Sequence, residues 1–295
     1  MNQVPNPATT AVLLLAHGSP DSVDQVPEFL LRVTGGRPLP PESIQEIQHR
    51  YGLIGHSPLT ELTRKQAELL AQKLTLKVYV GMRNWHPYIA DAVRTMTADG
   101  IRRTTVICLA PQNSRTSVGL YRAALAKENP AFTTDFIESW HDHPLLIQAF
   151  AEKLRARRPA DVPTLFTAHS VPQRTVTDGD PYELQAKETA ALVAKRAGLG
   201  SEDWTFAFQS QGMAGGPWLG PTVEDKILSL KQNGDNAVFI QPIGFLCDHV
   251  EVLYDIDIAF KQFAEKQGMD LTRAESLNDS PLLTAALADL ASRFA

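Results

Sequence analysis

Residues 165–172, LFTAHSVP, run from a short apolar segment into an Ala-His pair, a Ser and a Pro, and residues 13–20, LLLAHGSP, repeat that order. In an open α/β sheet, ligands bind at the carboxyl ends of the strands. His17 and His169 each stand at such an expected strand end. The repeat indicates two similar halves that bring both histidines to a common cleft. A match of eight residues is also compatible with chance similarity of two buried strands.

Short apolar runs alternate with longer stretches of helical periodicity along the chain. The runs are rich in β-branched or aromatic residues: AVLLLA (11–16), KVYVGM (77–82), TTVICLAP (104–111), TLFTA (164–168), WTFAFQ (204–209) and NAVFIQP (236–242). Helical periodicity marks ELTRKQAELLAQKL (61–74), LLIQAFAEKLRARR (145–158) and YELQAKETAALVAKRA (182–197). Strands separated by helices predict an α/β fold with parallel sheets and right-handed crossovers.

The pattern predicts two Rossmann-like halves. We place them at residues 1–150 and 151–295, because Pro-containing segments interrupt the pattern near 145–162. A terminal amphipathic helix is expected over 281–294, after a proline start, with packing back on the first half left open.

Composition excludes several classes of protein. The chain has 295 residues, 43% of them hydrophobic and 21% charged, as in soluble globular proteins. A net charge of −5 argues against general nucleic-acid binding. There is no apolar run of transmembrane length and no signal-peptide pattern in MNQVPNPATT. Cys108 and Cys247 lie in apolar contexts and are too few for a Cys-ligated iron–sulfur cluster. We therefore expect a cytoplasmic monomer without a membrane anchor.

Residues 242–257, PIGFLCDHVEVLYDID, concentrate groups that hold metals or move protons just after an expected strand. These groups are His249, Glu251, Asp255 and Asp257. A solvated helix N-terminus would explain the acids alone, because acidic residues are favoured there. It would not explain the histidine beside them, so we favour a functional site.

Seven segments in order along the chain resemble those of the ferrochelatases. They are LLAHGSP (14–20), RYGLIGHSPL (50–59), YVGMRNWHPYIADAV (79–93), LAPQNSRTSVGLY (109–121), TAHSVPQRTVTDGDPY (167–182), FQSQGMAGGPWLGP (208–221) and GFLCDHVEVLYDID (244–257). The resemblance implies two Rossmann-like halves around a porphyrin cleft. It also implies insertion of Fe²⁺, as a substrate, into a porphyrin in haem biosynthesis, without an organic cofactor.

The resemblance assigns the central chemistry to His169 and Glu251. Insertion requires removal of two pyrrole protons, and a histidine that is neutral near pH 7 can accept one. Imidazole with carboxylate also suits a transient Fe²⁺ site. Asp255 follows Glu251 by one helical turn and would extend a file of carboxylates along which the metal arrives. The family's next Glu is replaced here by Ala259, which breaks that file.

Other residues match positions that contact porphyrin in the coproporphyrin-using branch of the family. Arg50, Tyr51, Ser57 and Tyr121 match propionate-binding positions. Arg83 borders the cleft in relatives and is a further candidate contact. An Arg expected near residue 34 is replaced by Thr34, so Arg32 or Arg37 is expected to supply its charge.

Two aromatic positions depart from the bacterial pattern. His17 replaces a Tyr and would be an axial ligand of product iron. Phe208 replaces a Trp and keeps an aromatic wall without the indole N–H.

Three functions compete. The favoured one is a ferrochelatase acting on coproporphyrin III, with protoporphyrin IX as the second substrate. The alternatives are a cobalt or nickel chelatase for a sirohydrochlorin-type tetrapyrrole, and a porphyrin or haem carrier without catalysis. The presence of both His169 and Glu251 argues against a carrier, which needs no proton acceptor.

Overall fold

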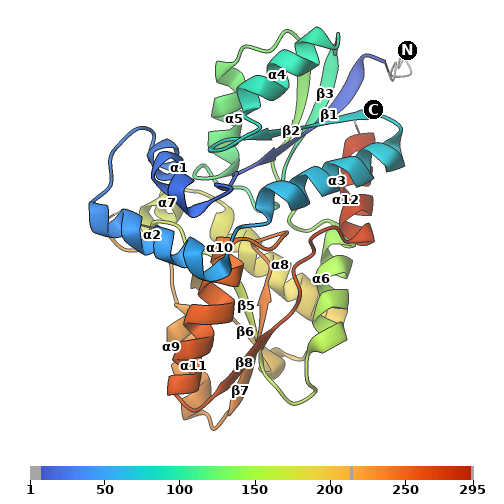
Figure 1. The fold of residues 1–295 in the computed structure, drawn as a ribbon. Coiled ribbons are helices and arrows are strands. Elements are labelled where there is room, and N and C mark those ends of the chain that lie inside the picture. The colour runs from blue at the N-terminus through green and yellow to red at the C-terminus, as the bar shows by residue number, and fades with distance from the viewer. Residues whose placement is uncertain (1–7, 213–214, 294–295) are drawn as a thin grey trace. The chain divides into compact units, whose positions relative to one another are not determined.

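A computed structural model describes residues 8–212 and 215–293 (Figure 1). Residues 1–7, to which most of MNQVPNPATT belongs, lie outside the described residues, as do Met213 and Ala214 of the segment at 208–221 and residue 294 of the expected terminal helix. The chain divides into two compact units, and the expected α/β class with parallel sheets is confirmed in both.

Unit 1 contains the described residues of Met1–Ala110, Ser117–Ser139 and Asn278–Ala295. Its parallel sheet has the order β2-β1-β3-β4. The strands are β1 (Thr10–Ala16), β2 (Lys77–Met82), β3 (Arg103–Cys108) and β4 (Thr133–Ile137). The helices are η1 (Val23–Gln25), α1 (Val26–Val33), α2 (Pro41–Ile54), α3 (Leu59–Leu74), α4 (Ile89–Ala98), α5 (Val118–Lys127) and α12 (Pro281–Ser292).

Unit 2 contains Pro111–Thr116 and the described residues of Trp140–Leu277. Its parallel sheet has the order β6-β5-β7-β8. The strands are β5 (Thr164–His169), β6 (Trp204–Gln209), β7 (Ala237–Pro242) and β8 (Asp270–Arg273). The helices are α6 (Pro144–Arg157), α7 (Gln173–Thr177), α8 (Tyr182–Ala197), η2 (Ser201–Asp203), α9 (Val223–Gln232), α10 (Val250–Leu253), the π-helix η3 (Asp255–Phe260) and α11 (Lys261–Lys266).

The two sheets have the same strand order, with the first strand of each unit second in its sheet. The two copies of the repeated motif begin in these strands, β1 and β5. The sequence repeat therefore marks equivalent positions in two four-stranded parallel sheets. A porphyrin cleft between the halves stays a prediction.

The boundary between the units differs from the expected one. Position 150 falls inside α6, which packs against α8 and belongs wholly to unit 2. Pro144 is the first residue of that helix, where a missing N–H costs nothing, so this proline starts an element and does not separate domains. The terminal helix α12 belongs to unit 1, where it lies beside α3 and contacts β3 (Figure 1).

Each sheet is buried on both faces, as parallel sheets require. All seven residues of β1 are buried. Leu13 and Leu15 share a core with Val93 of α4 and Leu125 of α5. Alternate residues of β1 face the opposite side, which α3 and α12 cover. Each fully buried Leu or Val of this kind contributes about 1.5–3 kcal/mol relative to exposure.

Unit 2 repeats this arrangement with different helices. Leu165 of β5 and Ile240 of β7 pack against the segment formed by α10, η3 and α11. That segment contributes Val252, Ile256 and Phe260 to the core. The acidic stretch after β7 is thus attached to one face of the sheet by its apolar side.

None of the helices within residues 8–212 and 215–293 combines the length and apolar character that a membrane crossing requires.

Candidate active site

In unit 2, strand β5 ends at His169. His169 lies four residues after Leu165 on β5 and so on the same face of the sheet, the face that α10 covers. Gly244, just after β7, passes close beside this end: a Cβ there would lie 3.0 Å from the Cα of Ala168. Only a glycine fits this approach without displacing the strand end.

His169 and Glu251 form an ion pair. His169 Nε2 lies 3.3 Å from Glu251 Oε1, and the two side chains are 32% and 33% exposed. The other ring nitrogen, Nδ1, donates to the carbonyl of Ser170, which fixes the ring orientation. Burial by itself would lower the pKa of His169, but the Glu251 carboxylate outweighs it and the pKa is raised. The pKa of Glu251 is correspondingly held well below its usual range, against the effect of burial. The pair is therefore imidazolium–carboxylate at neutral pH.

His249 contacts the same carboxylate from its other side. Its Nε2 lies 3.4 Å from Glu251 Oε2, and its Nδ1 donates to the carbonyl of Cys247 at 3.0 Å. It is also the residue that precedes α10, and its ring packs against Phe245 at 4.5 Å between centroids. In the sequence it was one of four groups at 242–257 that could hold a metal or move a proton. Its contacts in the structure are those of a brace that also touches Glu251.

Asp255 lies behind this pair, in the first turn of the π-helix η3. It is 7% exposed and accepts a hydrogen bond from Ser210 Oγ. Its charge contributes to raising the pKa of His169. Asp257, another acid of the stretch at 242–257, is instead paired with Arg273. Among the residues that the structure describes, no three His, Cys, Asp or Glu side chains are grouped as a metal-binding cluster.

Three positioning contacts around the pair were missed by sequence reasoning. Tyr182 is buried and donates from its hydroxyl to the carbonyl of His169 at 2.8 Å. Gln209 Nε2 donates to the carbonyl of Glu251 at 2.8 Å. Ser210, with φ +59°, turns its hydroxyl to Asp255. All three lie in segments that resemble the ferrochelatases, which was the available signal. Phe208 is 1% exposed and its ring packs near that of Tyr182, so it supports Tyr182 from the core of the unit.

The remaining candidates belong to unit 1. His17 is exposed and donates from Nδ1 to the carbonyl of Gly18 at 3.0 Å. Tyr51 is buried, and its hydroxyl shares a hydrogen bond of 3.0 Å with Ser19. Arg50 donates from Nε to Glu46 at 2.9 Å. The motif that follows β1 and the segment at 50–59 thus meet at Ser19 and Tyr51.

Two further candidates of unit 1 are also buried. Tyr121 is 6% exposed and lies near enough to Arg83 to affect its pKa. Ser57 is 6% exposed, and its hydroxyl has no hydrogen-bond partner among the described residues. A buried hydroxyl without a partner is costly, so Ser57 has capacity to donate to a ligand.

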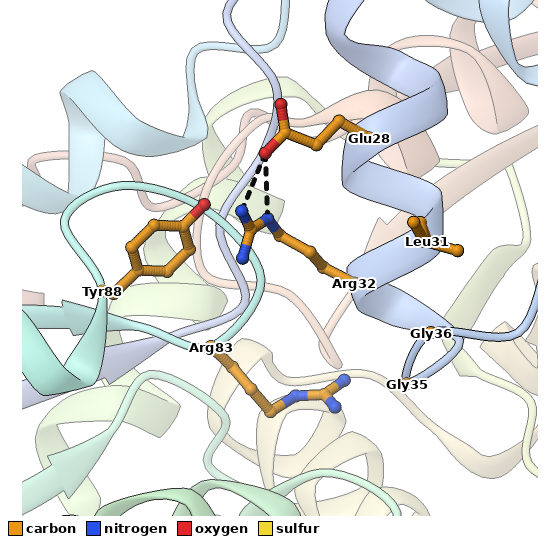
Figure 2. A pocket seen from close by; sticks show the side chains of 7 residues that line it. All are labelled: Glu28, Leu31, Arg32, Gly35, Gly36, Arg83 and Tyr88. Atoms are coloured by element: carbon orange, nitrogen blue, oxygen red, sulfur yellow. Dashed lines mark hydrogen bonds and ion pairs between the residues drawn. The ribbon is translucent and has the colours of Figure 1, made fainter.

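A pocket of about 540 Å³ in unit 1 presents two arginines (Figure 2). Its lining consists of Glu28, Leu31, Arg32, Gly35, Gly36, Arg83 and Tyr88. Arg32 pairs with Glu28 at 2.8 Å and lies over the Tyr88 ring at 4.8 Å. Arg37 instead donates to the carbonyl of Thr34. Of the two residues expected to replace the missing arginine, Arg32 is therefore the one that lines a pocket.

Arg83 is the second cation of this pocket. Figure 2 shows Arg32 directed to Glu28 and Tyr88, whereas Arg83 extends away from them. Burial lowers the pKa of Arg83, which Tyr121 partly opposes, and the guanidinium has no carboxylate partner among the described residues. A partly desolvated guanidinium without a counterion favours binding of an anion such as a carboxylate.

Comparison with known proteins agrees with this geometry. The ferrochelatase family model matches residues 9–294. The ferrochelatase of Acidobacterium capsulatum is 56% identical, covering 95% of this chain and 93% of the relative. The coproporphyrin III ferrochelatase of Geobacillus kaustophilus is 35% identical, covering 96% and 95%.

A solved structure shares the fold. The sirohydrochlorin chelatase SirB of Bacillus subtilis subspecies spizizenii, in complex with cobalt, superposes with a TM-score of 0.61 over 97% of this chain and 95% of that one. At 9% identity, this likeness establishes the fold and nothing more. The family match over nearly the whole chain is decisive: this protein belongs to the ferrochelatase family, enzymes that insert a metal into a porphyrin.

Proposed function

We propose that this enzyme inserts Fe²⁺ into coproporphyrin III, with His169 and Glu251 as the residues at which insertion takes place. The observation that supports this most is the ion pair at the end of β5, with Nε2 and Oε1 3.3 Å apart. It joins a proton acceptor to a carboxylate ligand, and insertion needs both.

The ionised state of the pair gives an order of events. With Glu251 as its counterion, His169 holds a proton and cannot accept another. When Fe²⁺ reaches the Glu251 carboxylate, it neutralises that charge and places a cation beside the imidazolium. Both effects lower the pKa of His169. The histidine then releases its proton to solvent, to which its side chain is 32% exposed, and becomes the acceptor for a pyrrole proton as the iron–nitrogen bonds form.

The second pyrrole proton needs another acceptor. Asp255 is buried close enough to influence His169 and is linked to Ser210. We assign it the next step, transfer of protons away from the pair. We also assign it to the route by which the metal arrives, in place of the file that Ala259 interrupts.

Coproporphyrin III is favoured because unit 1 offers many donors for carboxylates. Among the residues that the structure describes, Arg83 has no carboxylate partner and the Ser57 hydroxyl has no hydrogen-bond partner. Arg50 and Tyr51 in α2 and Tyr121 in α5 match propionate-binding positions of the family. Coproporphyrin carries four carboxylates and protoporphyrin IX carries two, so the former can contact more of these side chains at once. The relative from Geobacillus kaustophilus that is named a coproporphyrin III ferrochelatase supports the same choice.

We further propose that His17 ligates the iron of the product and that the enzyme acts as a cytoplasmic monomer. It needs neither an organic cofactor nor an iron–sulfur cluster. Both cysteines are free and buried, at Cys108 and Cys247, and a Cys-ligated cluster takes four.

One assay tests the proposal. The protein is mixed anaerobically with Fe²⁺ or Co²⁺ and coproporphyrin III, protoporphyrin IX or sirohydrochlorin, and the absorption bands are followed. We expect the highest kcat/KM with Fe²⁺ and coproporphyrin III. His169→Ala should lower kcat by about 100-fold or more. Arg83→Gln should raise the KM for coproporphyrin III more than that for protoporphyrin IX. Arg94→Gln, at an exposed ion pair on α4, is the matched control.

Each competing function has its own result in this assay. Cobalt insertion into sirohydrochlorin alone would establish the related chelatase. Tight porphyrin binding without any metallation would establish a carrier. The product spectrum also tests His17, because a nitrogen-ligated haem should be lost in His17→Ala.

A further inference from the structure

The last residue of β8, Arg273, joins two carboxylates that lie on either side of the catalytic segment. Its side chain is only 15% exposed. Nε donates to Asp257 Oδ1 at 2.7 Å and Nη2 donates to Asp257 Oδ2 at 2.8 Å, a bidentate pair. The same Nη2 lies 3.3 Å from Asp248 Oδ1. Ser276 Oγ donates to that Asp248 oxygen at 2.7 Å.

The two carboxylates bracket the residues of the proposed site. Asp248 comes directly before His249, the residue at the N-cap position of α10, and Asp257 lies two residues after Asp255 in η3. Between them the chain carries Glu251 and Asp255. One guanidinium therefore holds both ends of the segment that presents these acids to His169.

The segment formed by α10 and η3 is weakly stabilised by its own backbone hydrogen bonds, because both helices are short. The helix α10 has four residues and continues into the π-helix η3 of six. Runs of π-helix are rare, and a helix this short is marginal without tertiary contacts. Val252, Ile256 and Phe260 hold its apolar side against the sheet. On the polar side, Arg273 supplies the bidentate contact.

The charges give a second reason for the clamp. Without Arg273, Asp248 and Asp257 would be two like charges on one partly buried surface, with side chains 21% and 38% exposed. Repulsion and hydration of these carboxylates would draw the segment away from the sheet. The fork geometry of arginine fits a bidentate carboxylate, which a lysine cannot reproduce.

We infer that Arg273 is a positioning residue for metal insertion: it clamps Asp248 and Asp257 and thereby sets Glu251 and Asp255 at His169. This inference rests on the proposed function of the His169–Glu251 pair. It also assigns Asp257, an acid of the stretch at 242–257, to the clamp and not to the substrate metal.

The test separates positioning from general stability. Arg273→Met keeps an unbranched apolar stem but removes both charge and fork. We expect the KM for Fe²⁺ to rise about 10- to 100-fold, the range seen when a residue behind a metal ligand is lost. The KM for porphyrin should change less than twofold. Arg273→Lys should recover part of the loss, and adding Asp257→Asn to Arg273→Met should cost little more.

A matched control and a readout without turnover complete the test. Arg103→Met removes another strand arginine paired with an aspartate, Asp135, at 2.6 Å in unit 1, and should leave both KM values unchanged. Binding of Co²⁺ alone, followed by calorimetry, should weaken about 10-fold or more in Arg273→Met. If that variant does not fold, Arg273→Lys and Asp257→Asn, compared by the same measurements, decide the question.

The outcomes are distinct. Unchanged Co²⁺ affinity with equal changes in both KM values would show a merely structural role and overturn the inference. A wild-type enzyme that metallates no porphyrin would overturn the proposed function. In that case the Co²⁺ affinities of wild type and Arg273→Met would alone decide whether Arg273 positions the metal-binding acids.

Discussion

Replacing Glu251 by glutamine tests the ion pair on which the proposed chemistry depends. Glu251→Gln keeps the size and a hydrogen-bond acceptor but removes the charge 3.3 Å from His169 Nε2. At an effective dielectric constant near 20, two unit charges at this distance attract by roughly 5 kcal/mol. Both side chains are about one-third exposed, so water screens much of this and roughly 1–3 kcal/mol remains. The substitution should therefore lower the pKa of His169 by about one to two pH units.

The direction of the pH dependence follows from the two pKa shifts. The pKa of His169 is raised from 6.5 to about 9, so its contribution to stability is complete below pH 6.5 and is lost as the pH rises through about 9. The pKa of Glu251 is lowered from 4.5, so its contribution is present above pH 4.5 and is lost as the pH falls through the lowered value. The stability difference between wild type and Glu251→Gln should be largest between these limits, near pH 5–6.5, and smallest above pH 9.

Two measurements check this prediction. NMR titration of the His169 ring, assigned with His169→Ala, gives its pKa in each variant. Urea-induced unfolding at pH 6 and pH 9.5 gives the stability difference. Glu61→Gln, which removes the carboxylate beside the exposed His56, is the matched control and should leave the His169 titration unchanged. An ordinary pKa for His169 in the wild type, with no change in Glu251→Gln, would refute the reasoning.

Two substitutions test the scaffold that carries the site. Gly18→Ala should destabilise unit 1 by about 1–3 kcal/mol, because φ is +86° and the new Cβ would lie 2.8 Å from the backbone nitrogen of Trp85. Urea unfolding measures this, with Gly52→Ala in α2 as the control, where nothing lies within 4 Å and the change should be neutral or stabilising. Phe150→Ala, at a fully buried side chain of α6, should cost about 3–5 kcal/mol. A cost below about 1 kcal/mol would contradict its place in the core, and Leu184→Ala at a 71% exposed position should be near neutral.

The strands that sequence reasoning found and missed differ in burial. The six predicted runs became β1, β2, β3, β5, β6 and β7. The two missed strands, β4 (Thr133–Ile137) and β8 (Asp270–Arg273), are the last in their sheets and have several exposed residues. These two strands, TTDFI and DLTR, carry fewer apolar residues than the runs that were found, so periodicity alone does not reveal them. The end of the first unit was misplaced for a different reason, because Pro144 begins a helix and does not break one.

The site residues also divide into those that the sequence predicted and those that only the structure revealed. His169 and Glu251 stood out because a histidine at a strand end and an acid-rich turn are features of residue type and order. Tyr182 and Arg273 did not, because their roles depend on which carbonyl or carboxylate lies within reach.

By itself, the sequence determined the alternation of strands and helices, the parallel sheets, the repeated motif of the two units and the family. These are encoded in hydrophobic period and residue order, which are local properties of the chain. Only the tertiary structure decided that His169 holds a proton through Glu251, that Asp257 is bound by Arg273, and that Arg32, not Arg37, lines the pocket. Each of these depends on the distance between charges on separate segments and on how far burial excludes water from them, and neither quantity exists until the chain has folded.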